Sequence, residues 1–155
     1  MTTAAEVVAA LRGRGLTLAT AESLTGGLVA AEIVGVPGAS DVYAGGIVAY
    51  ATRLKHELLG VDAGLLEREG AIHPLVAEQM AAGVRARTGA DAGVATTGAA
   101  GPDPQDGHPP GDVWIAIATA DGVDSRHLAL AGDRLAIRRG TVDAVLALIA
   151  ETISE

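Results

Sequence analysis

Short β-rich segments alternate with helical segments over the first hundred residues of this chain. Strands are expected over Leu16–Thr20, Gly46–Tyr50 and Ala92–Thr97, and the main helices between them over Gly26–Val34 and Pro74–Thr88. Such alternation is typical of an α/β protein, in which helices cover both sides of a largely parallel sheet. The continuous apolar character of Gly46–Tyr50 predicts a strand that is buried on both faces.

The rest of the chain continues this scheme and adds a hairpin. Strands are expected over Val113–Ala120 and Val123–Leu130, and Asp121–Gly122 between them is typical of a two-residue hairpin turn. The hairpin brings in an antiparallel strand, so the sheet should be mixed. The remaining helices are expected over Thr3–Arg12, Thr52–Leu59, Ala63–Glu69 and Arg134–Ile153. A length of 155 residues fits a single domain over 1–155.

Large aromatic side chains are nearly absent. The chain has no Phe and only Tyr43, Tyr50 and Trp114. Its core must therefore be packed from Ala, Val, Leu and Ile, with 21 glycines allowing close approach of backbones.

Charge and composition exclude several classes of protein. Nineteen acidic against eleven basic residues give a net charge of -8, which disfavours nucleic acid as a partner. The absence of Cys excludes disulfides and thiol nucleophiles, and no spacing of His, Asp or Glu predicts a metal site. No signal peptide and no apolar run of about 18 residues is present, so we expect a soluble, cytoplasmic protein that does not enter a membrane.

The candidate site lies where strands end. In an α/β sheet, ligands bind at the carboxyl ends of the strands, and the Ser23 turn, Tyr50 and the Thr97 loop all fall there. The amides at the start of the helix after Ser23 could bind a phosphate or stabilise an oxyanion. The alternative is that Ser23 or Thr25 only caps that helix.

A serine needs a base, and the candidate base is Lys55. Ten of the eleven basic residues are Arg, which stays protonated, whereas a buried Lys can lose its proton. Ser–Lys pairs are a known variant of the catalytic triad, and Tyr50 could orient the lysine or relay a proton. Ile47, Val48 and Leu58 are expected to wall the amine; the alternative is a solvated surface charge. None of His56, His73, His108 and His127 has an obvious role.

Two further segments could contact a ligand. Thr96–Asp112 is a long loop rich in Gly and Pro, of the kind that is functional or disordered. Arginines near the start of the last helix could hold a phosphate. We expect Arg134 and Arg139, however, to lie on a solvated helix face.

Several blocks of the sequence, in order, resemble the CinA C-terminal domain family. They are TAESLTGGLVA (20–30), VPGAS (36–40), GGIVAYATRLKHELLGV (45–61), GAIHPLVAEQMAAG (70–83), TGAAGP (97–102), PPGDVWIAIAT and GDRLAIRRGTV. The family includes stand-alone nicotinamide mononucleotide deamidases, and the chain looks like one of these, without the N-terminal domain of full-length CinA proteins. The resemblance implies a three-layer α/β/α sandwich with a mixed, mostly parallel sheet, similar to anticodon-binding domains.

The resemblance also implies roles for individual residues. Ser23 matches the catalytic serine, Lys55 the lysine base, and Tyr50 the tyrosine that assists it. Arg138 matches an arginine placed to hold substrate, through its phosphate. Other positions correspond to backbone around the ligand: Thr25, Gly26, Gly27, Thr97 and Gly98. No cofactor or metal is implied, and family habit suggests a homo-oligomer such as a dimer.

The chain departs from the family pattern at a few positions. They are Leu24 for a cysteine, Ala51-Thr52 for Ser-Asn, His73 for a serine, Ala99 for an isoleucine and His108 for a lysine. These changes bear on substrate preference more than on the type of reaction.

The leading hypothesis is hydrolysis of nicotinamide mononucleotide to nicotinic acid mononucleotide and ammonia, with Ser23 as nucleophile and neutral Lys55 as base. Amides at the helix start would hold the tetrahedral oxygen. The alternatives are a non-catalytic module that binds a pyridine nucleotide and a Ser–Lys amidase of another small amide.

Overall fold

The computed structural model describes residues 1–155 and contains five strands, six α-helices and one short 3-10 helix. The strands are β1 (Leu18–Glu22), β2 (Tyr43–Val48), β3 (Ala92–Gly98), β4 (Asp112–Thr119) and β5 (Gly122–Ala129). The helices are α1 (Ala4–Arg14), α2 (Leu28–Val34), α3 (Thr52–Leu59), α4 (Ala63–Glu69), α5 (Pro74–Thr88) and α6 (Arg134–Ser154), and the 3-10 helix is η1 (Ala39–Asp41). No helix combines the length and the apolar character needed to cross a membrane.

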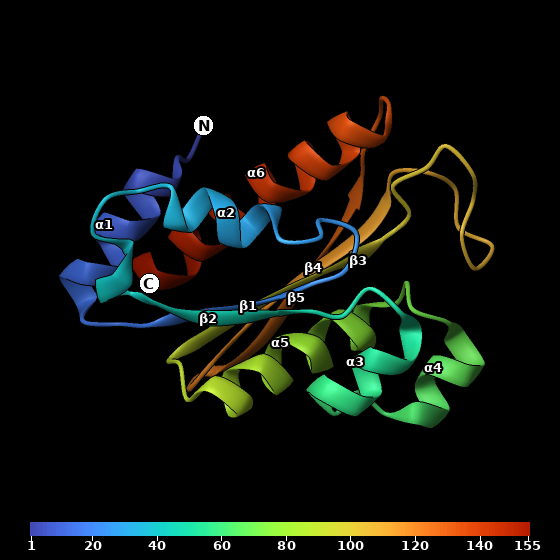
Figure 1. The fold of residues 1–155 in the computed structure, drawn as a ribbon, viewed down its shortest axis with the longest axis horizontal. Helices are drawn as coiled ribbons and strands as arrows, with labels where there is room; N and C mark the ends of the chain where they lie inside the picture. Colours follow the sequence, from blue (N-terminus) through green and yellow to red (C-terminus); the bar gives the residue numbers. More distant parts are fainter.

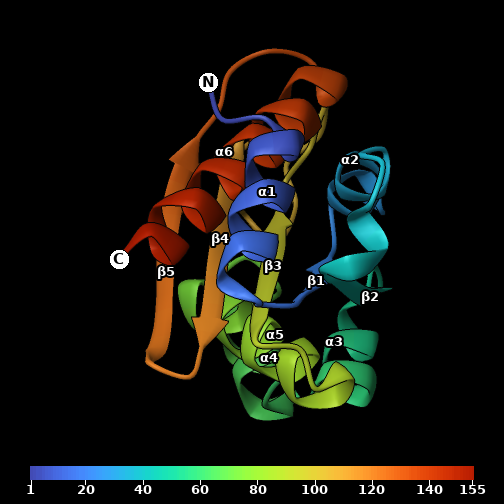
Figure 2. The ribbon, with the colours of Figure 1, turned by 90° about the vertical axis from the view of Figure 1, so that its left-hand side faces the viewer.

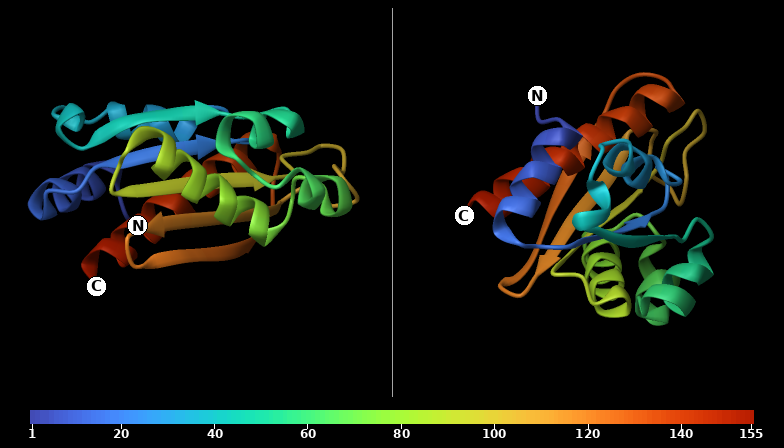
Figure 3. Two further views of the ribbon diagram at one scale, coloured as in Figure 1. Left: turned by 90° about the horizontal axis from the view of Figure 1, so that it is seen from below. Right: turned by 60° about the vertical axis from the view of Figure 1, so that its left-hand side comes forward.

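All five strands form one sheet in the order β2-β1-β3-β4-β5 (Figure 3). Strand β1 pairs in parallel with β2 and β3, whereas β4 is antiparallel to both β3 and β5. Four strands therefore share one direction and β4 alone runs against them, which confirms the mixed, mostly parallel sheet. The carboxyl ends of β1, β2 and β3 consequently meet at the same edge.

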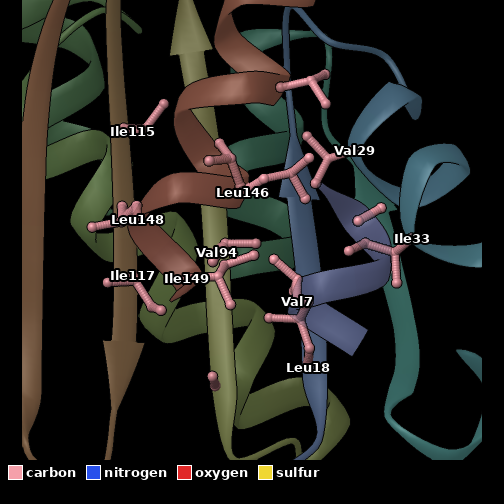
Figure 4. Close-up of a cluster of buried hydrophobic side chains, with 14 of the residues drawn as sticks. Val7, Leu18, Val29, Ile33, Val94, Ile115, Ile117, Leu146, Leu148 and Ile149 are labelled. Carbon is pink, nitrogen blue, oxygen red and sulfur yellow. The ribbon is translucent and has the colours of Figure 1, made fainter. Parts of the chain in front are cut away.

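Helices cover the sheet on both sides, so the three-layer α/β/α arrangement is confirmed. Helices α1, α2 and α6 lie on one face and α3, α4 and α5 on the other (Figures 1 and 2). The first face encloses a core of branched aliphatic side chains contributed by the sheet and by α1, α2 and α6 (Figure 4). In the second core the buried strand residues are all alanines, namely Ala19, Ala21, Ala95, Ala116 and Ala118, with Ile47 and Trp114 partly buried beside them.

Small residues on the second face let backbones approach closely. A Cβ at Gly93 in β3 would lie 2.3 Å from the Ala81 carbonyl oxygen of α5. A Cβ at Gly83 in α5 would lie 1.9 Å from the carbonyl oxygen of Leu59, the last residue of α3. Helix α5 therefore packs directly on the sheet, and the end of α3 rests on α5.

Two expectations about the elements are wrong. The apolar segment at Gly46–Tyr50 was expected to be buried on both faces, but β2 is an edge strand whose residues alternate in exposure, and Val48 is 47% exposed. Helix α2 begins at Leu28 rather than Gly26, because Gly26 and Gly27 have φ of +56° and +105°. Only glycine adopts such angles readily, so the pair forms a left-handed turn before the helix.

The close contact of α3 and α5 generates a prediction for stability. Gly83→Ala should lower the free energy of unfolding by about 3 kcal/mol, because a helix interior cannot move away from the Leu59 carbonyl without separating the two helices. Gly13→Ala in α1, where a Cβ meets nothing within 4 Å, should instead raise stability by about 0.5 kcal/mol. Urea unfolding of both variants measures the difference. Equal effects at the two sites would contradict this account of the packing.

Candidate active site

Ser23 lies at the carboxyl end of β1, in the turn that leads to α2. Its amide donates to the backbone carbonyl of Thr96 at 3.1 Å, and a second contact at 3.3 Å joins it to the Thr96 hydroxyl. The Thr25 and Thr96 hydroxyls are 2.8 Å apart. The N-cap residue of α2 is Gly27, and neither Ser23 nor Thr25 accepts a hydrogen bond from a helix amide with its side chain, so the alternative in which one of them only caps the helix is wrong. The Ser23 hydroxyl is left to contact Lys55.

Lys55 is a buried amine whose three hydrogen bonds are all made. Its side chain is 1% exposed, and its Nζ donates to Ser23 Oγ at 3.0 Å. The other two acceptors are the carbonyl oxygens of Ala49, at 2.8 Å, and Tyr50, at 3.2 Å. When the amine loses a proton, the two carbonyls retain the two remaining N–H groups, and the lone pair points to Ser23 Oγ. The solvated-surface alternative for Lys55 is therefore wrong.

Burial changes the proton affinity of this amine. Removal from water lowers the pKa of Lys55 from 10.5 to about 8, while the negative charge of Asp106 raises it. The expected walls do not provide this burial, because Val48 and Leu58 are 47% and 37% exposed. With a pKa of about 8, about one amine in ten is neutral at pH 7, which is enough for a general base.

The start of α2 is not available to a ligand. Glu22, whose side chain is fully buried, accepts hydrogen bonds from the amides of Val29 at 2.8 Å and Ala30 at 3.1 Å. The expectation that these helix amides hold the tetrahedral oxygen is therefore wrong, because a carboxylate of the protein already fills the position. Glu22 precedes Ser23 directly, so this cap also fixes the turn that carries the serine.

The amide of Leu24 is a free donor directly after the serine. Within this turn the amides of Ser23, Gly26 and Leu28 donate to backbone carbonyls, whereas those of Leu24, Thr25 and Gly27 donate to no protein group. Leu24 lines the same cavity as Ser23. The amide that follows a nucleophile is a common oxyanion donor in strand-to-helix turns.

A cavity of about 300 Å³ opens in front of the serine. Ser23, Leu24, Tyr50 and Gly98 line it from the strand ends, and Arg134 lines it from the start of α6. The long loop after β3 completes the wall with residues 100–105. The three segments expected to converge at this edge are thus brought together. The structure contains no group of three or more His, Asp or Glu side chains that could hold a metal ion.

The loop after β3 is well tied down. It projects beyond the sheet edge as the long segment between β3 and β4 (Figure 1). The Gly111 amide donates to the Ala99 carbonyl at 2.8 Å, which closes its base, and Arg134 Nη1 donates to the Gly101 carbonyl. Arg134 was expected on a solvated helix face; it is exposed, but its hydrogen bonds to Gly101 and Tyr50 also place it in the cavity wall, which was not expected. Its position as the first residue of α6 turns it toward the strand ends, while Arg139, as expected, is exposed and pairs with Glu32.

Tyr50 contributes to the site through two different groups. Its carbonyl oxygen accepts from Lys55, as described above, and so orients the amine. Its hydroxyl accepts a hydrogen bond from Arg134 Nη2 at 3.1 Å, on the cavity wall. The side chain is 58% exposed, so the ring and hydroxyl face the cavity mouth.

Of the remaining residues predicted for the site, one lines the cavity and the others hold the segments around it in place. Gly98 lines it, and a Cβ there would lie 2.7 Å from Val113 Cγ2. Thr97 donates from its hydroxyl to the Ala71 carbonyl at 2.7 Å. Arg138 donates to the carbonyls of Leu24 at 3.0 Å and Thr25 at 3.2 Å, so it holds the serine turn from behind. Gly26 and Gly27 provide the left-handed turn itself.

Three residues of this site were not predicted from the sequence, namely Glu22, Thr96 and Asp106, and Arg134 was expected elsewhere. The signal for Glu22 was present, since a carboxylate within an apolar strand must be hydrogen-bonded. The others depend on contacts between distant segments, which local patterns do not report.

Comparison with known proteins gives matches over nearly the whole chain. The family model described as CinA C-terminal domain matches residues 1–153. A CinA-like protein of Frankia casuarinae is 51% identical over 143 residues, which is 92% of this chain and 33% of that protein. A CinA-like protein of Synechococcus sp. is 50% identical over 120 residues, which is 77% of this chain and 29% of that protein. The chain thus spans about one third of the length of the curated relatives it matches.

Solved structures match the fold equally well. A competence-damaged protein (CinA) superfamily protein from Klebsiella pneumoniae has a TM-score of 0.94 at 31% identity, covering 97% of this chain and 95% of that chain. A competence/damage inducible protein from Agrobacterium tumefaciens has a TM-score of 0.93 at 33% identity, covering 98% and 93%.

The two hydrogen bonds that buried Glu22 accepts from α2 predict that its carboxylate stabilises the turn that carries Ser23. Glu22→Gln keeps the shape of the side chain but turns an amide NH2 toward a backbone N–H, so one hydrogen bond is lost and one donor is left buried. The free energy of unfolding should fall by about 2 kcal/mol in urea denaturation. The matched control is Glu32→Gln, a partly exposed glutamate on α2 itself, which should change stability by less than about 0.5 kcal/mol. A Glu22→Gln protein as stable as this control would show that the carboxylate does not hold the turn.

Proposed function

The chain belongs to the CinA C-terminal domain family, and we propose that it hydrolyses the carboxamide of nicotinamide mononucleotide to nicotinic acid mononucleotide and ammonia. One observation carries the proposal. The only lysine of the chain is buried with its Nζ 3.0 Å from Ser23 Oγ, at the wall of a cavity. A serine paired with a neutral lysine is suited to acyl transfer, and amide hydrolysis is one such reaction.

The first half of the reaction forms an ester on the serine. Ser23 Oγ attacks the carbon of the carboxamide while its proton passes to neutral Lys55 Nζ. The negative oxygen of the tetrahedral intermediate accepts a hydrogen bond from the backbone N–H of Leu24. The carbon–nitrogen bond then breaks, and the leaving nitrogen takes the proton from Lys55 and departs as ammonia. The Ala49 and Tyr50 carbonyls hold the amine in place throughout.

The second half returns the serine. Water attacks the ester carbon and gives its proton to Lys55, the bond to Ser23 Oγ breaks, and Lys55 passes that proton back to the serine oxygen. The products are the free hydroxyl of Ser23 and a carboxylic acid, which gives up its proton to water and leaves as a carboxylate. This cycle needs no group other than those of the chain and water.

Arg134 is the residue we assign to the phosphate of the substrate. It is the cationic side chain in the cavity lining, where Asp103 is the acidic one. Arg134 uses one N–H of each terminal nitrogen on Gly101 and Tyr50, which leaves other guanidinium donors for an anion. Arg138, expected from the family resemblance to hold the phosphate, has two donors on the serine turn and is absent from the lining.

The proposal is tested with purified protein and nicotinamide mononucleotide. Wild type should release ammonia, and Ser23→Ala and Lys55→Arg should each lower kcat about a thousandfold or more. Arginine keeps the charge of Lys55 but cannot give up its proton, so its failure isolates the base role. Ser40→Ala, an exposed serine, is the matched control and should retain full activity. Full activity in Lys55→Arg would overturn the mechanism, and tight binding by wild type without turnover would favour a binding module.

The phosphate assignment has its own test. Arg134→Gln should raise KM for nicotinamide mononucleotide about tenfold or more, because one charge-assisted contact is lost, with little change in kcat. Nicotinamide riboside, which lacks the phosphate, should be hydrolysed equally by both proteins. Arg139→Gln on the exposed face of α6 should match wild type. If the riboside suffers as much as the nucleotide, then Arg134 acts only on the structure of the cavity wall.

A further inference from the structure

Asp106 occupies the tip of a small hairpin within the loop after β3. Gln105 and His108 exchange two backbone hydrogen bonds, at 3.0 Å and 2.8 Å. Between them, Asp106 and Gly107 have φ of +50° and +80°, as the two central residues of a type I′ turn require. Asp106 is the one non-glycine residue of the chain with positive φ. Its carboxylate is therefore held in a set direction by an unusual backbone.

That carboxylate is seated on the turn between α4 and α5. It accepts a hydrogen bond from the Ala71 amide at 3.1 Å, while the Ala71 carbonyl accepts from Thr97 at 2.7 Å. Gly70 makes room for it, since a Cβ there would lie 3.0 Å from Asp106 Oδ2. The backbone of Ala71 thus connects the tip of the loop to the end of β3, through its N–H on one side and its carbonyl on the other. The cavity wall formed by residues 100–105 is anchored on this side by Asp106.

The same carboxylate acts electrostatically on the lysine. The ionisable groups near Lys55 include Glu22, beside Ser23, and His56 on its own helix, together with Tyr50, Asp103 and Arg134 of the cavity lining and Asp106 of the loop. Arg53 and Glu57 on the same helix are exposed and pair with each other. Glu22 is bound by two helix amides, His56 Nδ1 contacts the Val61 carbonyl at 2.8 Å, and Tyr50 is bound to Arg134. Of these groups, Asp106 is the one whose charge raises the pKa of Lys55, against the lowering caused by burial.

We infer that Asp106 is a positioning residue of the Ser23–Lys55 pair, which latches the cavity wall to the Ala71 turn and places a negative charge within electrostatic reach of the Lys55 amine. Its effect on catalysis rests on the proposed role of Lys55 as the base. Its effect on the charge of Lys55 does not, because that charge can be measured without a substrate.

The single lysine makes this measurement direct. Protein labelled with 13C at lysine Cε gives one lysine signal, and its change with pH reports the protonation of Lys55 alone. The wild-type midpoint should lie at about 8. Asp106→Asn keeps a side-chain oxygen for the Ala71 amide and tolerates positive φ, but it removes the charge. Because an ammonium is stabilised by a nearby anion, its midpoint should fall by about half a pH unit.

Two further variants separate charge from fold. Asp106→Gly also removes the charge and suits the positive φ, so its midpoint should fall as well, even though the contact with Ala71 is lost. Asp121→Asn removes an exposed carboxylate from the other Asp-Gly hairpin, at the far end of the sheet, and should leave the midpoint unchanged. An unchanged midpoint in Asp106→Asn, or an equal fall in Asp121→Asn, would overturn the inference.

The kinetic arm shows whether this charge matters to the reaction. The acidic limb of kcat/KM for nicotinamide mononucleotide should move to lower pH in Asp106→Asn by the same amount as the midpoint, because more of the amine is then neutral at a given pH. A structural defect alone would lower the whole profile without moving the limb, and would contradict the inference. Absence of turnover in wild type would refute the proposed function while leaving the lysine titration as the test of Asp106.

Discussion

The site depends on one contact, between the amine of Lys55 and the hydroxyl of Ser23, and on the cost of placing that amine away from water. An ammonium group without partners is expensive to bury, so the chain surrounds this one with two carbonyls and a hydroxyl. The two carbonyls come from the end of β2 and the serine from the end of β1. Parallel pairing of these strands is therefore what brings the amine and the hydroxyl together.

The core of small residues serves this geometry from a distance. Lys55 lies on α3, and the end of α3 rests on α5 at a position where only glycine leaves room for a carbonyl. Helix α5 in turn packs on strands whose buried side chains on this face are alanines. Each layer is thus set by backbone contact rather than by bulky side chains. Such contacts allow little change in the distance between neighbouring layers. The amine of Lys55 therefore stays at a fixed distance from the strand ends.

Much of the fold was predictable, because periodicity and turn residues report on local structure. The α3, α4 and α5 boundaries and the convergence of Ser23, Tyr50 and Thr97 at one edge agree with the structure. The β4–β5 hairpin is also confirmed, but its two turn residues are Ala120 and Asp121 rather than Asp121 and Gly122, because Gly122 already pairs with Thr119. The failures share a physical cause. The exposure of β2 depends on its place at the edge of the sheet, and the position of Arg134 depends on where α6 meets the loop after β3. Neither of these contacts can be inferred from residues that are neighbours in the sequence.

Glu22 has a consequence for the direction from which a substrate can approach. A helix N-terminus next to a nucleophile would ordinarily attract the anionic end of a ligand. Here a carboxylate belonging to the protein occupies it, and its own charge repels a second anion. Under the proposed function, the phosphate of the substrate would then lie toward Arg134 in α6 and its carboxamide toward Ser23 at the end of β1. Glu22 thus blocks one of the two positions where an anionic group could bind, and this would set the orientation of the bound ligand.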